Sequence, residues 1–326
     1  MPLTDLTLAE LRAYRPTIDV PSDFDDFWST TLEESRAAAV AHGSSTTLVA
    51  AGTPVTELVV EDLTFPGFNG EPIRGWVTRP RTGGSGATVV QYVGYGGGRG
   101  LPHENLHWAA SGFVHVLMDT RGQGSAWGTG GDTPDPHGSG PAFPGFMTRG
   151  IQSRETYYYR RVFTDAVRLI DAVSEFDFVD PGAIAVTGGS QGGAITLAVS
   201  GLVPTLAGVM PDVPFLCHFR RSVELTPDAP FTELREYLAV HRTEVDDVFR
   251  TLSYFDGVAF AQRAAAPARF SVALMDPIVL PSTVFAAYNS YAGADREIDV
   301  YEFNGHEGGQ GYQWLEQVAW LRSKLL

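Results

Sequence analysis

Gly188-Gly189-Ser190-Gln191-Gly192-Gly193 is the most informative stretch of the chain, because it contains the pattern Gly-x-Ser-x-Gly. It follows an apolar run at residues 183–187 and precedes a helical pattern at residues 194–200. A serine on a sharp turn between a strand and a helix stands clear of the sheet, beside the free N–H groups of the helix's first turn. Glycines must flank the serine, since strand and helix approach closely there. We therefore predict that Ser190 is a nucleophile.

Short apolar runs alternate with helical patterns on both sides of this stretch. We expect strands at residues 56–64, 73–78, 87–93, 113–118, 183–187, 268–274 and 297–303, and helices at residues 7–14, 23–41, 157–176, 194–200 and 312–326. The turn Phe68-Asn69-Gly70-Glu71 predicts that the first two strands form an antiparallel hairpin. Apolar strands alternating with helices indicate a mostly parallel sheet covered on both faces, with its chemistry at the carboxyl ends of the strands.

The expected fold class is therefore α/β, and the serine turn makes it the α/β-hydrolase fold. The chain has 326 residues, with no internal repeat, low-complexity tract or sharp change of composition. We expect one catalytic domain over residues 1–326, whose first 55 residues form an N-terminal helical extension.

A serine hydroxyl is a weak nucleophile that needs a neighbouring base, and the base needs an orienting carboxylate. In this fold the three residues follow the order Ser, acid, His, so the search begins after Ser190. His306 comes just after the last apolar strand and before the closing helix, where the base is expected. His218 is expected in packing or a supporting role, and His241 on the surface.

The acid is predicted to be Asp276, the first carboxylate after the strand at residues 268–274. Three other acidic residues compete for the role. Asp295 lies in a polar turn, Asp299 lies within a strand, and Glu307 adjoins the base in sequence. Neighbours in sequence seldom face each other well, so Asp276 remains the choice.

An oxyanion hole needs two N–H donors aimed at the developing negative oxygen. One is expected to be the backbone N–H of Gln191, the residue after the nucleophile. The other should come from the loop after residues 87–93, with Tyr92 preferred and Val93 and Gly94 next.

Composition and pattern exclude several other functions. The chain has 23 Lys and Arg against 38 Asp and Glu, a net charge of −15, which disfavours nucleic acid and anionic membranes as partners. A dinucleotide fingerprint in the Gly94 loop would need a glycine where Arg99 stands. Cys217 is the one cysteine, so no intrachain disulfide can form, and we expect a buried thiol. The start of the chain lacks a charged region followed by an apolar one, so we expect a cytoplasmic protein.

Several motifs together resemble one known family, that of acetyl xylan esterases and cephalosporin C deacetylases, carbohydrate esterase family seven. The matching stretches cover residues 91–95, 118–124, 144–150, 157–163, 188–193, 212–221, 274–276, 281–289 and 306–309. The combination of Arg121-Gly122-Gln123, Gly-x-Ser-Gln-Gly around Ser190, and His306-Glu307 is specific to this family.

The resemblance implies metal-free deacetylation without a cofactor, with the triad on Ser190, Asp276 and His306. It implies oxyanion donors on the backbones of Tyr92 and Gln191. It also implies cytoplasmic hexamers, dimers of trimers, whose sites face an inner cavity and favour short acetylated sugars over polymer.

Two features of the matching motifs have their own interpretations. Family members usually carry Asn-Ile-Cys-Pro after the acid, whereas this chain has Pro277-Ile278-Val279-Leu280. Pro277 removes a backbone donor and biases Asp276 toward an extended conformation, which affects the geometry of the acid. Arg121, close to Asp119, is expected to tie loops together rather than touch substrate.

The expected function is that of a serine esterase that removes acetyl groups from small substrates, such as acetylated xylo-oligosaccharides and cephalosporin C, through an acetyl-enzyme. One alternative keeps the fold but cuts longer acyl esters or peptides. Another is a catalytically silent ligand-binding protein with the same fold.

Overall fold

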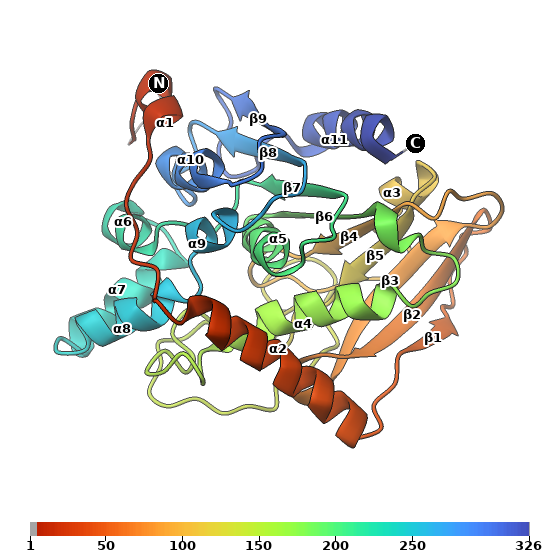
Figure 1. Cartoon of the computed structure of the whole chain (residues 1–326), viewed down its shortest axis with the longest axis horizontal. Coiled ribbons are helices and arrows are strands. Elements are labelled where there is room, and N and C mark those ends of the chain that lie inside the picture. Colours follow the sequence, from red (N-terminus) through yellow and green to blue (C-terminus); the bar gives the residue numbers. More distant parts are fainter. Residues whose placement is uncertain (1–4, 326) are drawn as a thin grey trace.

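The computed structural model describes residues 5–325, and within them the strands form one nine-stranded sheet of order β1-β2-β3-β5-β4-β6-β7-β8-β9 (Figure 1). The strands are β1 (Thr47–Ala50), β2 (Leu58–Pro66), β3 (Pro72–Pro80), β4 (Thr88–Tyr92), β5 (Val114–Met118), β6 (Ile184–Gly189), β7 (Gly208–Asp212), β8 (Ala268–Ala273) and β9 (Arg296–Tyr301). From β5 to β9 across the sheet all neighbours are parallel, and β1, β2 and β3 pair antiparallel.

Most helices follow a strand and return the chain to the start of the next one. The helices are α1 (Leu8–Ala13), α2 (Phe24–Ala41), α3 (His107–Ala110), α4 (Tyr158–Val173), α5 (Gln191–Leu202), α6 (Phe219–Leu225), α7 (Phe231–Val240), α8 (Val245–Ser253), α9 (Gly257–Ala261), α10 (Pro281–Ser290) and α11 (Gln310–Leu325), with short 3₁₀ turns at Phe68–Gly70 and Pro181–Ala183. Residues 1–4 and Leu326, included in the expected domain and closing helix, lie outside the described residues.

The two faces of the sheet have separate apolar cores, because successive side chains along a strand point to opposite faces. Val90 and Val186 belong to the larger core, beneath α2, α4, α5, α9 and α10. Val89 and Ala185, their neighbours in sequence, belong to the smaller core, which α11 and α3 cover. Helices on both faces confirm the expected α/β class, and the β2–β3 hairpin is confirmed as well.

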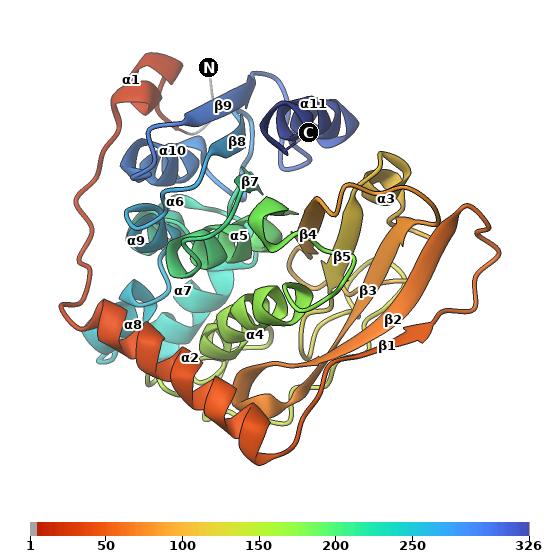
Figure 2. The same ribbon diagram turned by 45° about the vertical axis from the view of Figure 1, so that its right-hand side comes forward.

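The N-terminal segment is only partly helical. Its long helix α2 packs against α4 and the hairpin turn, and in Figure 2 it runs along the outside of the helical layer. Trp28 anchors α2, since its buried indole donates to the Tyr254 carbonyl oxygen at 3.0 Å. Residues 47–50, expected within a helical extension, instead add β1 to the edge of the sheet. No helix within residues 5–325 is long and apolar enough to span a bilayer.

Candidate active site

Ser190 lies in a strained turn between β6 and α5. Its φ of 55° and ψ of −117° are rare for a residue with a side chain, and such strain is typical of functional turns. The flanking glycines are required sterically: a Cβ at Gly192 would overlap the Tyr92 carbonyl oxygen, and one at Gly188 would overlap the backbone of Gly192. The neighbouring strand β7 also holds the turn, because the Ser190 amide donates to the carbonyl oxygen of Asp212 at 2.9 Å.

The structure brings Ser190, His306 and Asp276 into one hydrogen-bonded line. His306 Nδ1 donates to Asp276 Oδ2 at 2.8 Å, in the tautomer that leaves Nε2 to accept from Ser190 Oγ at 3.0 Å. The Asp276 side chain is fully buried, whereas the imidazole is 30% exposed. The three residues come from the ends of β6, β8 and β9, so the order of parallel strands sets their spacing.

Pro277 does not displace the carboxylate of Asp276, the predicted acid. The turn after it lets Asp276 Oδ1 accept from the backbone N–H of Ile278 at 2.8 Å and of Val279 at 2.9 Å. Oδ2 is then free to accept from His306. The missing donor at Pro277 is therefore replaced by the next two amides, so that three N–H groups hold the carboxylate in one orientation.

The competing residues are engaged elsewhere. Asp295 pairs with Lys324, Asp299 with Arg269, and Glu307 accepts from Asn304. Of the other two histidines that follow Ser190 in the chain, His218 contacts the Tyr14 hydroxyl and His241 contacts Glu244.

Tyr92, the predicted second oxyanion donor, is not brought to the site. It lies inside the sheet opposite Met118 and Gly188, its carbonyl abuts Gly192, and its side chain donates to the Ala166 carbonyl oxygen. The chain must leave the sheet before an amide can face Ser190.

Gly94 and Tyr95, just beyond the strand, do line the cavity that contains Ser190 and His306. Among the described residues, the backbone N–H groups of Tyr95 and Gln191 donate no hydrogen bond, so both can serve an incoming oxygen. Sequence reasoning missed Tyr95; the signal available was the glycine-rich turn that lets the chain bend back toward Ser190.

The cavity beside Ser190 is small and mostly apolar. It has a volume of about 330 Å³, and its walls include Ala229, Pro230 and Ile278. Trp127 also lines the cavity: the residue is 54% exposed, and its Nε1 donates to the Tyr95 carbonyl oxygen at 2.7 Å. A larger cavity of about 720 Å³ lies between residues 17–23 and α8, and its lining does not include Ser190, Asp276 or His306.

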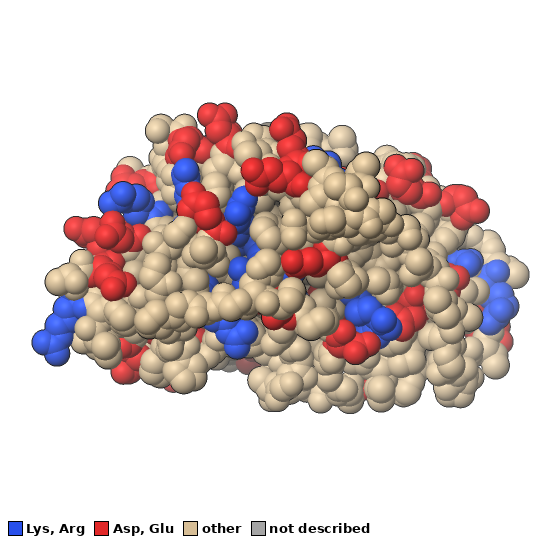
Figure 3. All heavy atoms as spheres, turned by 90° about the horizontal axis from the view of Figure 1, so that it is seen from below, with Lys and Arg blue, Asp and Glu red and all other residues tan. Residues whose placement is uncertain are grey.

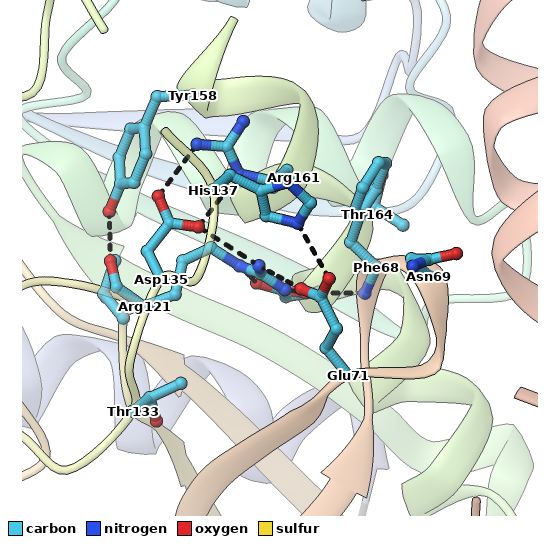
Figure 4. A network of polar contacts seen from close by, with 12 residues as sticks. Phe68, Asn69, Glu71, Arg121, Thr133, Asp135, His137, Tyr158, Arg161 and Thr164 are labelled. Carbon is cyan, nitrogen blue, oxygen red and sulfur yellow. Dashed lines mark hydrogen bonds and ion pairs between the residues drawn. The ribbon is translucent and has the colours of Figure 1, made fainter. Parts of the chain in front are cut away.

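Arg121 is buried at the centre of an ion-pair network, as shown in Figure 4. It forms a two-bond pair with Asp165 at 2.6 and 2.8 Å, and also contacts Glu71 at 2.6 Å. Burial raises the pKa of Asp165, and the arginine opposes that rise. The expected loop-tying role of Arg121 fits these contacts, which join the loop after β5 to Asp165 on α4 and to Glu71.

The surface and the remaining titratable groups add little chemistry. Figure 3 shows acidic and basic side chains interspersed on one face of the molecule. Cys217 is buried, and burial raises the pKa of its thiol. Within the described part of the chain, no three His, Cys, Asp or Glu residues are grouped so as to hold a metal ion.

The sheet order, the serine turn and the position of Ser190 at the carboxyl end of β6 define an α/β-hydrolase. A family model described as acetyl xylan esterase matches residues 1–324. The chain therefore belongs to the acetyl xylan esterase family, and it is a serine esterase that removes acetyl groups.

Individual relatives agree with this family. A solved acetyl xylan esterase from a Paenibacillus species is 35% identical, with a TM-score of 0.88 over 98% of this chain and 100% of the other. Acetyl xylan esterase 1 from a Thermoanaerobacterium species is 31% identical, with a TM-score of 0.88 over 98% of this chain and 99% of the other. Acetyl esterase Axe7A of Xylanibacter ruminicola is 25% identical, over 95% of this chain and 69% of that protein.

Proposed function

We propose that Ser190, His306 and Asp276 are the catalytic triad of this esterase, with the backbone N–H groups of Gln191 and Tyr95 as its oxyanion hole. The observation that carries the proposal is the line of two hydrogen bonds, 3.0 Å from Ser190 to His306 and 2.8 Å from His306 to Asp276. A serine, an imidazole and a carboxylate in that geometry perform acyl transfer on many unrelated folds.

The reaction proceeds through an acetyl-enzyme. His306 Nε2 takes the Ser190 proton as the hydroxyl oxygen attacks the acetyl carbonyl, and the negative oxygen accepts from the two amides. Asp276 stabilises the imidazolium, which then protonates the leaving alcohol. Water attacks the acetyl group by the same steps, releasing acetate and restoring Ser190.

The substrate class we propose is small acetyl esters, including acetylated xylo-oligosaccharides and cephalosporin C. The small size of the cavity beside Ser190, about 330 Å³, and the apolar walls that Pro230 and Ile278 contribute support a short acyl group. The names of the relatives support the xylan-derived esters.

Replacement of Ser190 tests the mechanism. S190A should lose p-nitrophenyl acetate hydrolysis by about 10⁶-fold, if subtilisin is a guide. H306A should lose most of its activity, whereas the matched control H241A, which removes a surface histidine paired with Glu244, should keep wild-type activity. Substantial hydrolysis by S190A would rule the assignment out.

Two further measurements separate the alternatives. Rates on p-nitrophenyl esters of two, four and eight carbons should fall steeply with chain length, whereas an esterase for long acyl chains would show the reverse. Covalent labelling of Ser190 by a fluorophosphonate is expected here, and a silent ligand-binding protein would not be labelled.

We also propose a cytoplasmic hexamer, a dimer of trimers, as the family resemblance implies. Light scattering of the purified chain measures the mass of the assembly, and cell fractionation measures its location. A monomer in solution contradicts the first expectation, and recovery outside the cell contradicts the second.

A further inference from the structure

The side chain of Gln191 is fully buried and does not line the cavity beside Ser190, whereas its backbone N–H is the proposed oxyanion donor. It meets Gln123, a residue of the loop after β5 that is 7% exposed. Gln123 Nε2 donates to Gln191 Oε1 at 2.9 Å, and Gln191 Nε2 donates to Gln123 Oε1 at 3.2 Å. The two side chains thus form a reciprocal amide pair beneath the proposed oxyanion hole.

Each glutamine also binds the loop that carries Tyr95. Gln123 Oε1 accepts from the Gly96 N–H at 2.7 Å, and Gln191 Nε2 donates to the Val93 carbonyl oxygen at 3.2 Å. The loop is therefore held on both sides of Tyr95, one residue after it and two residues before it. The glutamine pair therefore connects the loop that carries Tyr95 to Gln191, and these two residues provide the two proposed oxyanion donors.

Every hydrogen-bonding position of the two amides is occupied. Gln123 Nε2 also donates to the Tyr158 hydroxyl at 3.0 Å, and Gln191 Oε1 also accepts from the Tyr159 hydroxyl at 2.9 Å. An amide group has two donor hydrogens and two acceptor lone pairs, so each glutamine makes its full four hydrogen bonds. Fully satisfied buried networks are rigid, since any rotation leaves a buried polar group unpaired.

Tyr158 connects the glutamine pair to Arg121, the centre of the ion-pair network. Tyr158, which accepts from Gln123, donates its own hydroxyl hydrogen to the Arg121 carbonyl oxygen (Figure 4). The Arg121 side chain is held by Asp165 and Glu71. The motifs Arg121-Gly122-Gln123 and Gly-x-Ser-Gln-Gly therefore meet in one network.

We propose that Gln123 is a positioning residue that sets the separation of the Tyr95 and Gln191 amides for the tetrahedral intermediate, acting through its pair with Gln191. The inference rests on the proposed oxyanion hole. Donors fixed before the reaction cost no reorganisation when charge develops, so losing their support should affect the transition state more than the bound substrate.

The test replaces Gln123 with methionine, which has a similar length and no hydrogen-bonding amide. For Q123M we expect kcat on p-nitrophenyl acetate to fall by about 10- to 100-fold, somewhat less than on outright loss of a donor, with KM changed by less than about threefold. Methaneboronic acid, which forms a tetrahedral adduct on Ser190, should lose affinity by the factor lost in kcat/KM. The pH profile should keep its midpoint, because the contacts of His306 are untouched.

The double variant and a matched control separate positioning from stability. If the glutamines act as a unit, Q123M/Q191M should lose no more than about threefold beyond the worse single variant. Asn289→Leu is the control: it removes a buried side-chain amide that donates to the Leu11 and Tyr14 carbonyl oxygens, and none of these residues lines the cavity beside Ser190. It should lower the melting temperature while leaving kcat unchanged. If Q123M does not fold, Q123N, whose amide is one methylene too short to reach both Gly96 and Gln191, replaces it with the same expected loss.

Three results would overturn the inference: a folded Q123M with wild-type kcat, a rise in KM alone, or an equal loss of kcat in N289L. S190A in the same assay keeps the two proposals apart. An inactive S190A beside a fully active Q123M refutes only the positioning role, whereas an active S190A refutes the triad.

Discussion

Asp212 offers a direct test of what a buried carboxyl group next to the Ser190 turn does to stability. It ends β7, and its carbonyl oxygen accepts from the Ser190 amide at 2.9 Å. Its carboxylate accepts from the Ser271 hydroxyl at 2.8 Å and from Gln317 Nε2 at 3.0 and 2.9 Å, both neutral groups. Burial raises the pKa of Asp212 to about 7, and Asp299 adds a smaller repulsion.

The raised pKa predicts the direction and size of a pH effect on stability. An unfolded aspartate has a pKa of about 3.9, so between that value and about 7 the folded chain holds a proton that the unfolded chain releases. Stability from this group is present at low pH and is lost as pH rises through the folded pKa. Integrating the difference in bound protons between the folded and unfolded chain from pH 5 to pH 8 gives a loss of about 2.5 kcal/mol in the free energy of unfolding. Because Asp212 is partly exposed to solvent, we expect a loss of about 2 kcal/mol.

The perturbation is Asp212→Asn, which keeps the size of the side chain and cannot ionise. Urea unfolding of wild type and D212N gives the free energy of unfolding of each at a series of pH values. The free energy of unfolding of wild type minus that of D212N should fall by about 2 kcal/mol from pH 5 to pH 8. Asp295→Asn, at a surface acid paired with Lys324, corrects for the general change of charge. A difference that stays constant, or grows with pH, refutes the reasoning.

Two other substitutions test the turn and its support. Arg121→Met leaves the buried Asp165 without its cation and should lower the free energy of unfolding by about 3–5 kcal/mol, measured by urea unfolding; a loss under 1 kcal/mol contradicts the network. Gly192→Ala overlaps the Tyr92 carbonyl oxygen and should reduce kcat/KM by about 100-fold or more, on the scale of a lost oxyanion donor, whereas the matched control Gly189→Ala, whose Cβ meets open space, should stay within a fewfold of wild type. Equal effects of the two glycine substitutions contradict the steric argument.

Local patterns predicted the elements that lie near the serine turn. The expected runs at residues 87–93, 113–118 and 183–187 correspond to β4, β5 and β6, and residues 157–176 contain α4. These strands are buried on both faces, so their apolar runs are unbroken. Strand β7 has no such signal, because its five residues include Pro211 and Asp212 and form no unbroken apolar run. The sequence also does not indicate β1, a short edge strand that is largely exposed.

The candidate triad could be deduced from chain order, because each of its members follows a strand and parallel strands end at one edge. The turn after Asp276 could not be deduced. Pro277 indicated a lost donor, but the replacement of that donor by the amides of Ile278 and Val279 depends on the fold of the following loop. Sequence shows which donors are missing locally and leaves open which amides take their place.

The same limit explains why the sequence indicates Tyr92, Val93 and Gly94 but not Tyr95. The apolar run ends near Tyr92, but an amide inside a sheet belongs to the ladder, and the Tyr92 carbonyl is pressed against Gly192 under the serine turn. An oxyanion donor has to come from backbone that has left the sheet and still has a fixed position. At Tyr95, the proposed donor, the neighbouring glycines let the backbone leave the sheet. Gln123 and Gln191 fix its position by bonding to Gly96 and Val93 on either side. Because those glutamines lie 68 positions apart in the chain, only the folded structure brings them together.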